Sequence, residues 1–169
     1  MDFGAEFANY ASDCSRTIPV NGRFTSRQKQ LYNATLSVFH KAKPLMVKGT
    51  TIALLNKQVG KLWEEEHVRL GLYSQKDILT QDAEYPLYMK YFMHGISHFL
   101  GLDVHDVGSR LQTLEPGMVL TLEPGIYIRE EGIGIRLEND ILITDDKPID
   151  LMQEIPIEAE EIEELMSRS

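Results

Sequence analysis

The sequence is poor in several features that would define its class. It has one cysteine, Cys14, among 169 residues, which excludes an internal disulfide and a cysteine-rich zinc site. No apolar run approaches the roughly 18–20 residues that a membrane-spanning helix needs, and the N-terminus has no charged-then-apolar signal pattern. We therefore expect no membrane partner and a reducing, cytoplasmic setting.

Positive charge is also scarce. The chain has 17 Lys and Arg residues against 26 Asp and Glu residues, which gives a formal net charge of -9. No basic stripe stands out, so we expect no nucleic-acid partner. A site that binds divalent cations through several carboxylates would contribute to this negative charge, although an acidic balance is more often a matter of solubility.

What is present is typical of an ordinary folded domain. Apolar residues make up 43% of the chain and charged residues 25%, which are the proportions of a globular protein. The length predicts a single domain over residues 1–169, large enough to bury about two thirds of the surface that its unfolded chain would expose.

The N-terminal half predicts a hairpin followed by two helices. Residues 1–13 have the aromatic content of two short strands around a turn. Thr25 and Gln28 form a capping-box signature, which begins a helix over about 25–43. A second helix is expected over about 51–70, where apolar residues recur on one face.

The C-terminal half changes from helical to strand character. Residues 72–90 show no clear periodicity, whereas two segments over 118–128 and 134–144 are rich in Ile, Leu and Val and are joined by a Glu-Glu-Gly turn. Residues 158–166 predict an acidic helix that is exposed to solvent or frayed. The whole pattern predicts an α+β domain.

Two carboxylates interrupt the apolar strand segments. Glu123 lies among apolar neighbours in the first segment and Glu138 among those in the second. An ionised carboxylate is expensive to bury unless it is paired or binds a metal. For either residue alone, a structural ion pair with Arg136 would also explain its position.

Asp2 and Asp13 add a second pair of acids. If the hairpin turns near its middle, their side chains lie almost opposite each other, and like charges that face across strands repel. At about 4 Å and an effective dielectric near 20, each such pair costs about 4 kcal/mol. Four converging carboxylates could not all stay ionised without compensating positive charge, and two divalent cations would supply it.

The nearby histidines indicate which cations would suit the site. His94, His98 and His105 lie in one short stretch that contains small glycines. A lone histidine is usually a surface or core residue, but three together favour a site. Oxygen ligands with one imidazole, from His98 or a neighbour, suit Mn²⁺, Fe²⁺, Co²⁺ or Zn²⁺, and the dominance of oxygen favours Mn²⁺.

The order of these residues resembles a known family. The blocks that carry the resemblance, in chain order, are Asp2 to Asp13, His94-Gly95-Ile96-Ser97-His98 with Leu102-Asp103-Val104-His105-Asp106, Glu115-Pro116-Gly117-Met118, Leu122-Glu123-Pro124-Gly125, and Gly134-Ile135-Arg136-Leu137-Glu138. Together they resemble the pita-bread metallopeptidases of family M24. The wording around Asn9-Tyr10-Ala11-Ser12-Asp13-Cys14-Ser15-Arg16-Thr17 is similar to the Xaa-Pro aminopeptidase branch.

The resemblance implies a fold and an extent. The fold would be a curved, mostly antiparallel sheet with helices on its outer face. Residues 1–169 would be the C-terminal part of the catalytic domain, without the first half of that domain. An apolar face left uncovered by that missing half could be buried in a homo-oligomer.

The resemblance also implies a metal-ligand set. Asp2 would chelate one metal and Asp13 would bridge both. His98 and Glu123 would hold the second metal, and Glu138 would bridge the two.

Further roles follow for residues around the ligands. Glu123 would carry a proton from the attacking water to the leaving nitrogen. His105 would hydrogen-bond the substrate or the developing oxyanion, and His94 would line the pocket for the residue after the scissile bond. Arg136 would orient carboxylates or substrate, although a purely structural pair with an acid is the alternative.

The implied activity is hydrolysis of the first peptide bond of peptides with proline in second position, by a water that the two metals activate. A proline dipeptidase and a non-catalytic binding module of the same fold are the alternatives. The Ser-Asp-Cys-Ser-Arg-Thr and Leu-Asp-Val-His-Asp wording argues against a methionine aminopeptidase.

Overall fold

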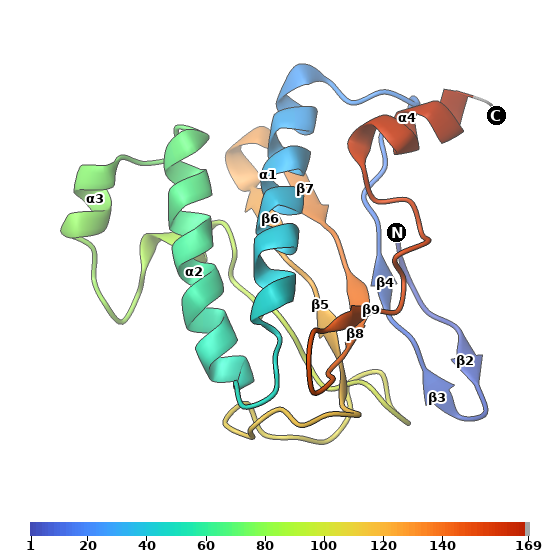
Figure 1. The fold of residues 1–169 in the computed structure, drawn as a ribbon. Helices are drawn as coiled ribbons and strands as arrows, with labels where there is room; N and C mark the ends of the chain where they lie inside the picture. The colour runs from blue at the N-terminus through green and yellow to red at the C-terminus, as the bar shows by residue number, and fades with distance from the viewer. Residues whose placement is uncertain (168–169) are drawn as a thin grey trace.

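The computed structural model describes residues 1–167 and combines helices with short antiparallel strands (Figure 1). The strands are β1 (Asp2–Phe3), β2 (Glu6–Phe7), β3 (Tyr10–Ala11), β4 (Cys14–Ser15), β5 (Val119–Leu122), β6 (Gly125–Ile128), β7 (Ile133–Arg136), β8 (Asn139–Leu142) and β9 (Ile149–Asp150). The helices are α1 (Ser26–Ala42), α2 (Ile52–Arg69), α3 (Gln75–Leu79) and α4 (Ala159–Ser167), with the 3-10 turns η1 (Lys43–Leu45), η2 (Leu87–Lys90) and η3 (Arg129–Glu131). The mixture confirms the expected α+β class.

The two long helices begin where their capping residues predict. The Thr25 side chain accepts a hydrogen bond from the backbone of Gln28, whose side chain accepts one from the backbone of Thr25. The Thr51 side chain caps α2 in the same way, through the backbone N–H of Leu54. α1 packs beside α2 and against β6 and β7 (Figure 1), so the helices cover one face of the strands.

The apolar core lies between these helices and the strands. Its largest fully buried side chains come from both layers, among them Tyr32, Phe39, Trp63, Leu120 and Leu122. Burying each such side chain contributes about 1.5–3 kcal/mol. Within residues 1–167, no helix is both long and apolar enough to cross a membrane.

The N-terminal hairpin has a different register from the one we expected. Asp2 pairs with Ser15 and Phe3 with Cys14, so Asp2 does not lie opposite Asp13 and the hairpin extends beyond residue 13. The reason is the turn at Ala8 and Asn9, which both have positive φ and place the centre of the hairpin later than we assumed.

The two apolar segments of the C-terminal half form one interrupted hairpin. β5 pairs with β8 and β6 pairs with β7, all antiparallel. Each predicted strand is broken at an acid: Glu123 separates β5 from β6, and Glu138 separates β7 from β8. These interruptions place the two acids at the middle of the sheet.

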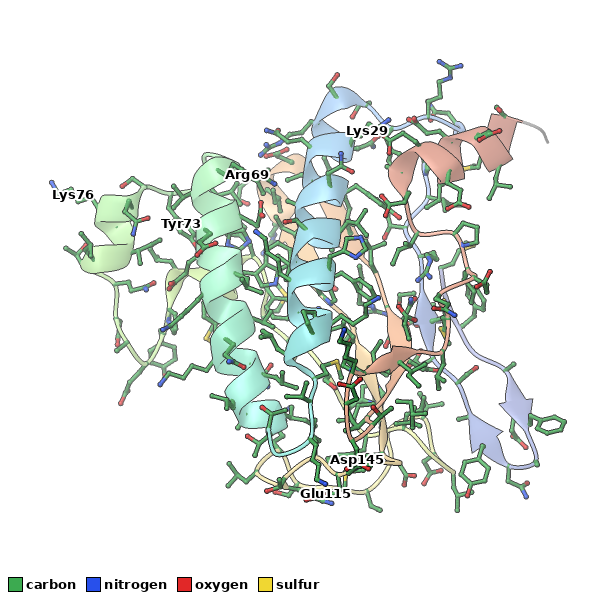
Figure 2. The ribbon with its side chains drawn as sticks, in the orientation of Figure 1. Lys29, Arg69, Tyr73, Lys76, Glu115 and Asp145 are labelled. Carbon is green, nitrogen blue, oxygen red and sulfur yellow. The ribbon has the colours of Figure 1, made fainter. Side chains whose placement is uncertain are left out.

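The acidic C-terminal helix is attached more firmly than we expected. Ala159 and Ile162 of α4 are buried in the core. Lys29 extends from the neighbouring helix α1 (Figure 2), and it forms ion pairs with Glu160 and Glu163. The acidic face of this helix is exposed to solvent, as expected, but the alternative of a frayed tail was wrong, because an apolar stripe attaches the helix to the core.

Candidate metal centre

The five residues expected to bind metal come together in one cleft. It has a volume of about 540 Å³ and also contains His94, His105, Arg110 and Arg136. Three overlapping sets have ligand atoms within 4.8 Å of one another: Asp2 with Asp13 and Glu138; His98 with Glu123 and Glu138; and Asp13 with His98 and His105. The predicted set thus converges in space, and His105 lies close enough to join it.

Backbone hydrogen bonds between neighbouring segments bring these ligands together. The backbone N–H of Glu123 donates to the Ile96 carbonyl over 2.9 Å, and that of Glu138 donates to the Ser15 carbonyl over 3.1 Å. Ser15 in turn pairs with Asp2. The segments that supply the acids and the histidine therefore lie side by side, although they are far apart in sequence.

The orientation of His98 suits a cation. Its Nδ1 lies 3.0 Å from the carbonyl oxygen of Phe99 and must donate to it, since a carbonyl only accepts. In the neutral ring Nε2 carries a lone pair, and it faces the carboxylate oxygens of Asp13 at 3.5 Å and Glu123 at 3.8 Å. A lone pair beside two carboxylates is unfavourable unless a cation lies between them, which is the usual arrangement of a metal-binding histidine.

The acids Glu123 and Glu138 also need a nearby cation if they are to be ionised. Burial, together with the nearby Glu138 carboxylate, raises the pKa of Glu123 to about 8. Burial and the Asp13 carboxylate raise the pKa of Glu138 to about 7. A bound cation would favour the ionised form of each acid, so the donor chemistry of the cleft fits divalent metal ions.

Arg136 pairs mainly with Asp2. Its guanidinium donates to Asp2 Oδ2 and, through Nε, to the Ser15 hydroxyl over 2.9 Å. That hydroxyl lies 2.7 Å from Glu138 Oε2, to which it donates, whereas Arg136 Nε is 3.9 Å from the same oxygen. Arg136 thus holds Asp2 directly and contacts Glu138 mostly through Ser15.

His94 is held in one tautomer by two neighbours. Its Nδ1 donates to the Gly95 carbonyl over 2.8 Å, so its Nε2 accepts from the Tyr127 hydroxyl over 2.9 Å. Burial lowers the pKa of His94, which favours the neutral ring. His94 Nδ1 also lies 3.8 Å from Glu123 Oε2, so this histidine borders the ligands without being placed among them.

The sequence interpretation missed Arg110, which lines the cleft, and Tyr127, which hydrogen-bonds His94. Arg110 lines the cleft from a loop without periodic pattern, so no sequence signal singled it out. Tyr127 could have been found, because alternate strand residues share a face and it follows Glu123 by four positions. His105, which the sequence did single out, is exposed and stacks edge-on against His98, with ring centroids 4.3 Å apart.

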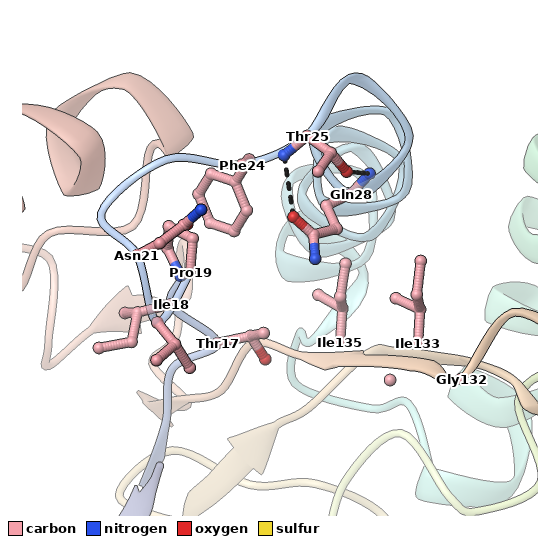
Figure 3. Close-up of a pocket in the computed structure, with 12 residues that line it drawn as sticks. Thr17, Ile18, Pro19, Asn21, Phe24, Thr25, Gln28, Gly132, Ile133 and Ile135 are labelled. Atoms are coloured by element: carbon pink, nitrogen blue, oxygen red, sulfur yellow. Dashed lines mark hydrogen bonds between the residues drawn. The ribbon is translucent and has the colours of Figure 1, made fainter.

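A separate groove lies beside the N-terminus of α1 (Figure 3). It has a volume of about 410 Å³ and includes Phe24, Ile133 and Ile135, together with the Thr25 and Gln28 capping pair. None of its lining residues within the described chain is acidic or a histidine. The chemistry-bearing side chains are therefore gathered in the cleft and not here.

Comparison with known proteins shows the family of this chain. Residues 1–145 match the model of metallopeptidase family M24. The chain is 41% identical to the Xaa-Pro aminopeptidase of Escherichia coli (strain K12), over 98% of this chain and 40% of that protein. It is likewise 41% identical to the Xaa-Pro aminopeptidase of Haemophilus influenzae, over 99% of this chain and 41% of that protein.

Solved structures agree with the sequence relatives. Zinc-substituted E. coli aminopeptidase P in complex with product is similar with a TM-score of 0.88 and 40% identity, over 99% of this chain and 40% of that one. The fold is thus the pita-bread fold of aminopeptidase P, as the resemblance predicted. The chain belongs to metallopeptidase family M24, and it spans about 40% of the length of these relatives.

Proposed function

We propose that this chain is the metal-binding part of an Xaa-Pro aminopeptidase, which removes the first residue from peptides that have proline in second position. The observation that carries the proposal is the convergence of carboxylate and imidazole atoms within 4.8 Å in three overlapping sets. Membership of a metallopeptidase family supports the same conclusion. The chain spans about 40% of the length of its relatives. The activity of the whole protein is therefore proposed for it and not shown.

The metal site would hold two divalent cations. Asp2 would chelate one cation, and His98 and Glu123 would hold the other. Asp13 and Glu138 would be shared, since each occurs in the set with Asp2 and in a second set with His98. We propose Mn²⁺ as the cation, because oxygen donors dominate the set, with Co²⁺, Fe²⁺ or Zn²⁺ as alternatives.

The cations, when bound, would polarise the peptide carbonyl and lower the pKa of a water molecule towards neutrality. The chain's own residues would supply positioning and proton transfer. Glu123, which lines the cleft, is our candidate for moving a proton from the attacking water to the leaving nitrogen. Arg136 would fix the direction of the Asp2 carboxylate, which it contacts directly.

His94 and His105 would face the substrate from two sides of the cleft. The Tyr127 hydroxyl and the Gly95 carbonyl hold His94, so its ring is a fixed wall for the residue after the scissile bond. His105 is exposed beside His98, and within residues 1–167 no hydrogen bond holds its ring. It could therefore turn to hydrogen-bond the substrate or a developing oxyanion.

Proline in second position has a physical meaning for such a site. An Xaa-Pro bond is a tertiary amide without an N–H, so the site must not depend on that donor. Proline preference, homo-oligomer formation and the cytoplasmic setting are parts of the proposal that rest on resemblance and composition. So is the single-domain organisation of residues 1–169 as the C-terminal part of a catalytic domain.

Release of the N-terminal residue from an Xaa-Pro-Xaa tripeptide tests the proposal, with added Mn²⁺, with chelator and with Glu138→Ala as the control. Cleavage that needs Mn²⁺ and is lost in the variant supports an aminopeptidase. Cleavage of Xaa-Pro dipeptides alone would indicate a proline dipeptidase. Tight Mn²⁺ binding without cleavage would favour a binding module, or a site that needs the rest of the longer relatives to turn over. Absence of Mn²⁺ binding would overturn the proposal.

A further inference from the structure

The strand β8 changes partner along one of its edges. At Glu138, just before β8 begins, this edge meets β4, because the backbone N–H of Glu138 donates to the Ser15 carbonyl over 3.1 Å. At Asp140 it meets the end of β9, because the backbone N–H of Leu151 donates to the Asp140 carbonyl over 2.9 Å. The N-terminal hairpin and β9 therefore share the edge, one after the other.

This change of partner leaves Asp13 without a main-chain acceptor on β8. Thr17 contacts Arg136, Ser15 contacts Glu138 and Asp13 contacts Asp140, so the two segments run in opposite directions and Asp13 lies opposite Asp140. The Asp140 carbonyl is already bonded to Leu151. The N–H of Asp13 instead donates to Oδ2 of the Asp140 side chain over 3.2 Å, so a carboxylate takes the place of a backbone carbonyl.

Asp140 is a costly side chain at this position. Its exposed fraction is 3%, and its other oxygen, Oδ1, has no hydrogen-bond partner within residues 1–167. A buried polar atom without a partner costs free energy. An apolar residue would avoid this cost but would leave the Asp13 N–H without its acceptor, so the contact with Asp13 is what accounts for an acid here.

The residue that Asp140 holds is central to the metal site. Asp13 contributes ligand atoms to two of the three sets, one with Asp2 and Glu138 and one with His98 and His105. It lies between β3 and β4, outside either strand. The direction of its carboxylate therefore depends on what fixes its own backbone.

We propose that Asp140 is a positioning residue of the metal centre, which accepts the Asp13 N–H and so fixes the backbone from which the shared carboxylate reaches both cations. This inference rests on the proposed function, because it takes Asp13 as a metal ligand. Removing a group that orients a metal ligand typically weakens metal affinity by about 10- to 100-fold.

The test is titration calorimetry of Mn²⁺ into the metal-free chain and four variants. Asp140→Leu removes the acceptor with a larger side chain, and Asp140→Ala removes it and leaves space, so the acceptor is tested even if one of them folds poorly. Asp140→Asn removes the charge and keeps an oxygen acceptor. Asp150→Asn is the matched control, because Asp150 is also buried in this sheet but accepts hydrogen bonds from Asn139.

The proposal expects Asp140→Leu and Asp140→Ala to bind Mn²⁺ about 10- to 100-fold more weakly. Asp140→Asn should restore most of the affinity, and Asp150→Asn should lower thermal stability without weakening Mn²⁺ binding. Unchanged Mn²⁺ affinity in Asp140→Leu would overturn the proposal, and so would an equal loss of affinity in Asp150→Asn. An equal loss in Asp140→Asn would also overturn it, by showing that only the charge of Asp140 matters. No Mn²⁺ binding by the unchanged chain would instead overturn the proposed function, and this inference with it.

Discussion

Glu123 and Glu138 face each other across the interrupted hairpin of β5–β8 and β6–β7. The register pairs Leu122 with Asn139 on one side of the break and Gly125 with Arg136 on the other, so the two acids occupy opposite positions between the strand pairs. Their backbone N–H groups point outward to Ile96 and Ser15. A pair of buried like charges at the middle of a sheet is stable only if something offsets their repulsion.

Glu138→Gln should change metal affinity and stability in opposite directions. The amide keeps an oxygen that can accept from Ser15, but it cannot carry the charge that binds two cations. We expect loss of at least one Mn²⁺ equivalent by calorimetry, and a higher melting temperature of the metal-free protein at pH 8. Glu131→Gln, at an exposed ion pair with Arg27, is the control and should leave metal binding unchanged. Two tightly bound equivalents in Glu138→Gln would remove this residue from the ligand set.

The metal-free chain should lose stability as the pH rises. Burial raises the pKa of Glu123 to about 8 and that of Glu138 to about 7, from an ordinary value of 4.5. An acid whose pKa is raised by folding stabilises the folded state below its unfolded value, and that contribution is lost as the pH rises through the folded value. We therefore expect the melting temperature in chelator to fall by about 5 °C or more between pH 5 and pH 8.5.

Added Mn²⁺ supplies the control for that measurement. Cations favour the ionised acids, so their stabilising effect should grow with pH and offset most of the fall. A melting temperature in chelator that is constant or rises over this pH range would show that the acids are not held in the neutral form in the folded chain.

His105→Ala should separate substrate contact from metal binding. The ring of His105 is exposed, and its ligand atom lies near those of Asp13 and His98. We expect the metal content, measured by elemental analysis after dialysis, to stay the same while turnover falls about 100-fold, the scale of a lost catalytic hydrogen bond. His98→Ala is the matched comparison and should lose metal. Loss of metal in His105→Ala would make it a ligand.

Much of the site could be predicted from the sequence because its chemistry is unusual for its surroundings. Glu123 and Glu138 were visible as acids within apolar strands, and the histidines as a cluster. The long helices were visible through capping and periodicity. These signals are local, so they can be read from neighbouring residues along the chain.

What the sequence could not supply is register. The pairing of Asp2 with Ser15 and not with Asp13 depends on a turn at Ala8 and Asn9, where neither residue is a glycine. Arg110 reaches the cleft from an irregular loop. The role of Asp140 depends on two strands sharing an edge of β8, which no local pattern predicts.

Tyr127→Phe tests how His94 is held. The Tyr127 hydroxyl donates to His94 Nε2 over 2.9 Å, while Nδ1 donates to the Gly95 carbonyl. Without the hydroxyl, Nε2 has no protein donor and the ring can take up a proton more readily. We expect metal content to stay the same, turnover to fall by about 10-fold, and the pKa of His94, followed by the NMR shifts of its ring, to rise.

The neighbouring Tyr91→Phe is the matched control for this variant, because Tyr91 contacts the ring of His67 and not that of His94. It should leave both turnover and the His94 titration unchanged. If Tyr127→Phe lost metal as well as activity, Tyr127 would act on the ligand set and not through His94. If the His94 titration did not move, the hydrogen bond would not control its protonation, and the pocket wall would depend on packing against Phe92, whose ring lies 4.7 Å from that of His94.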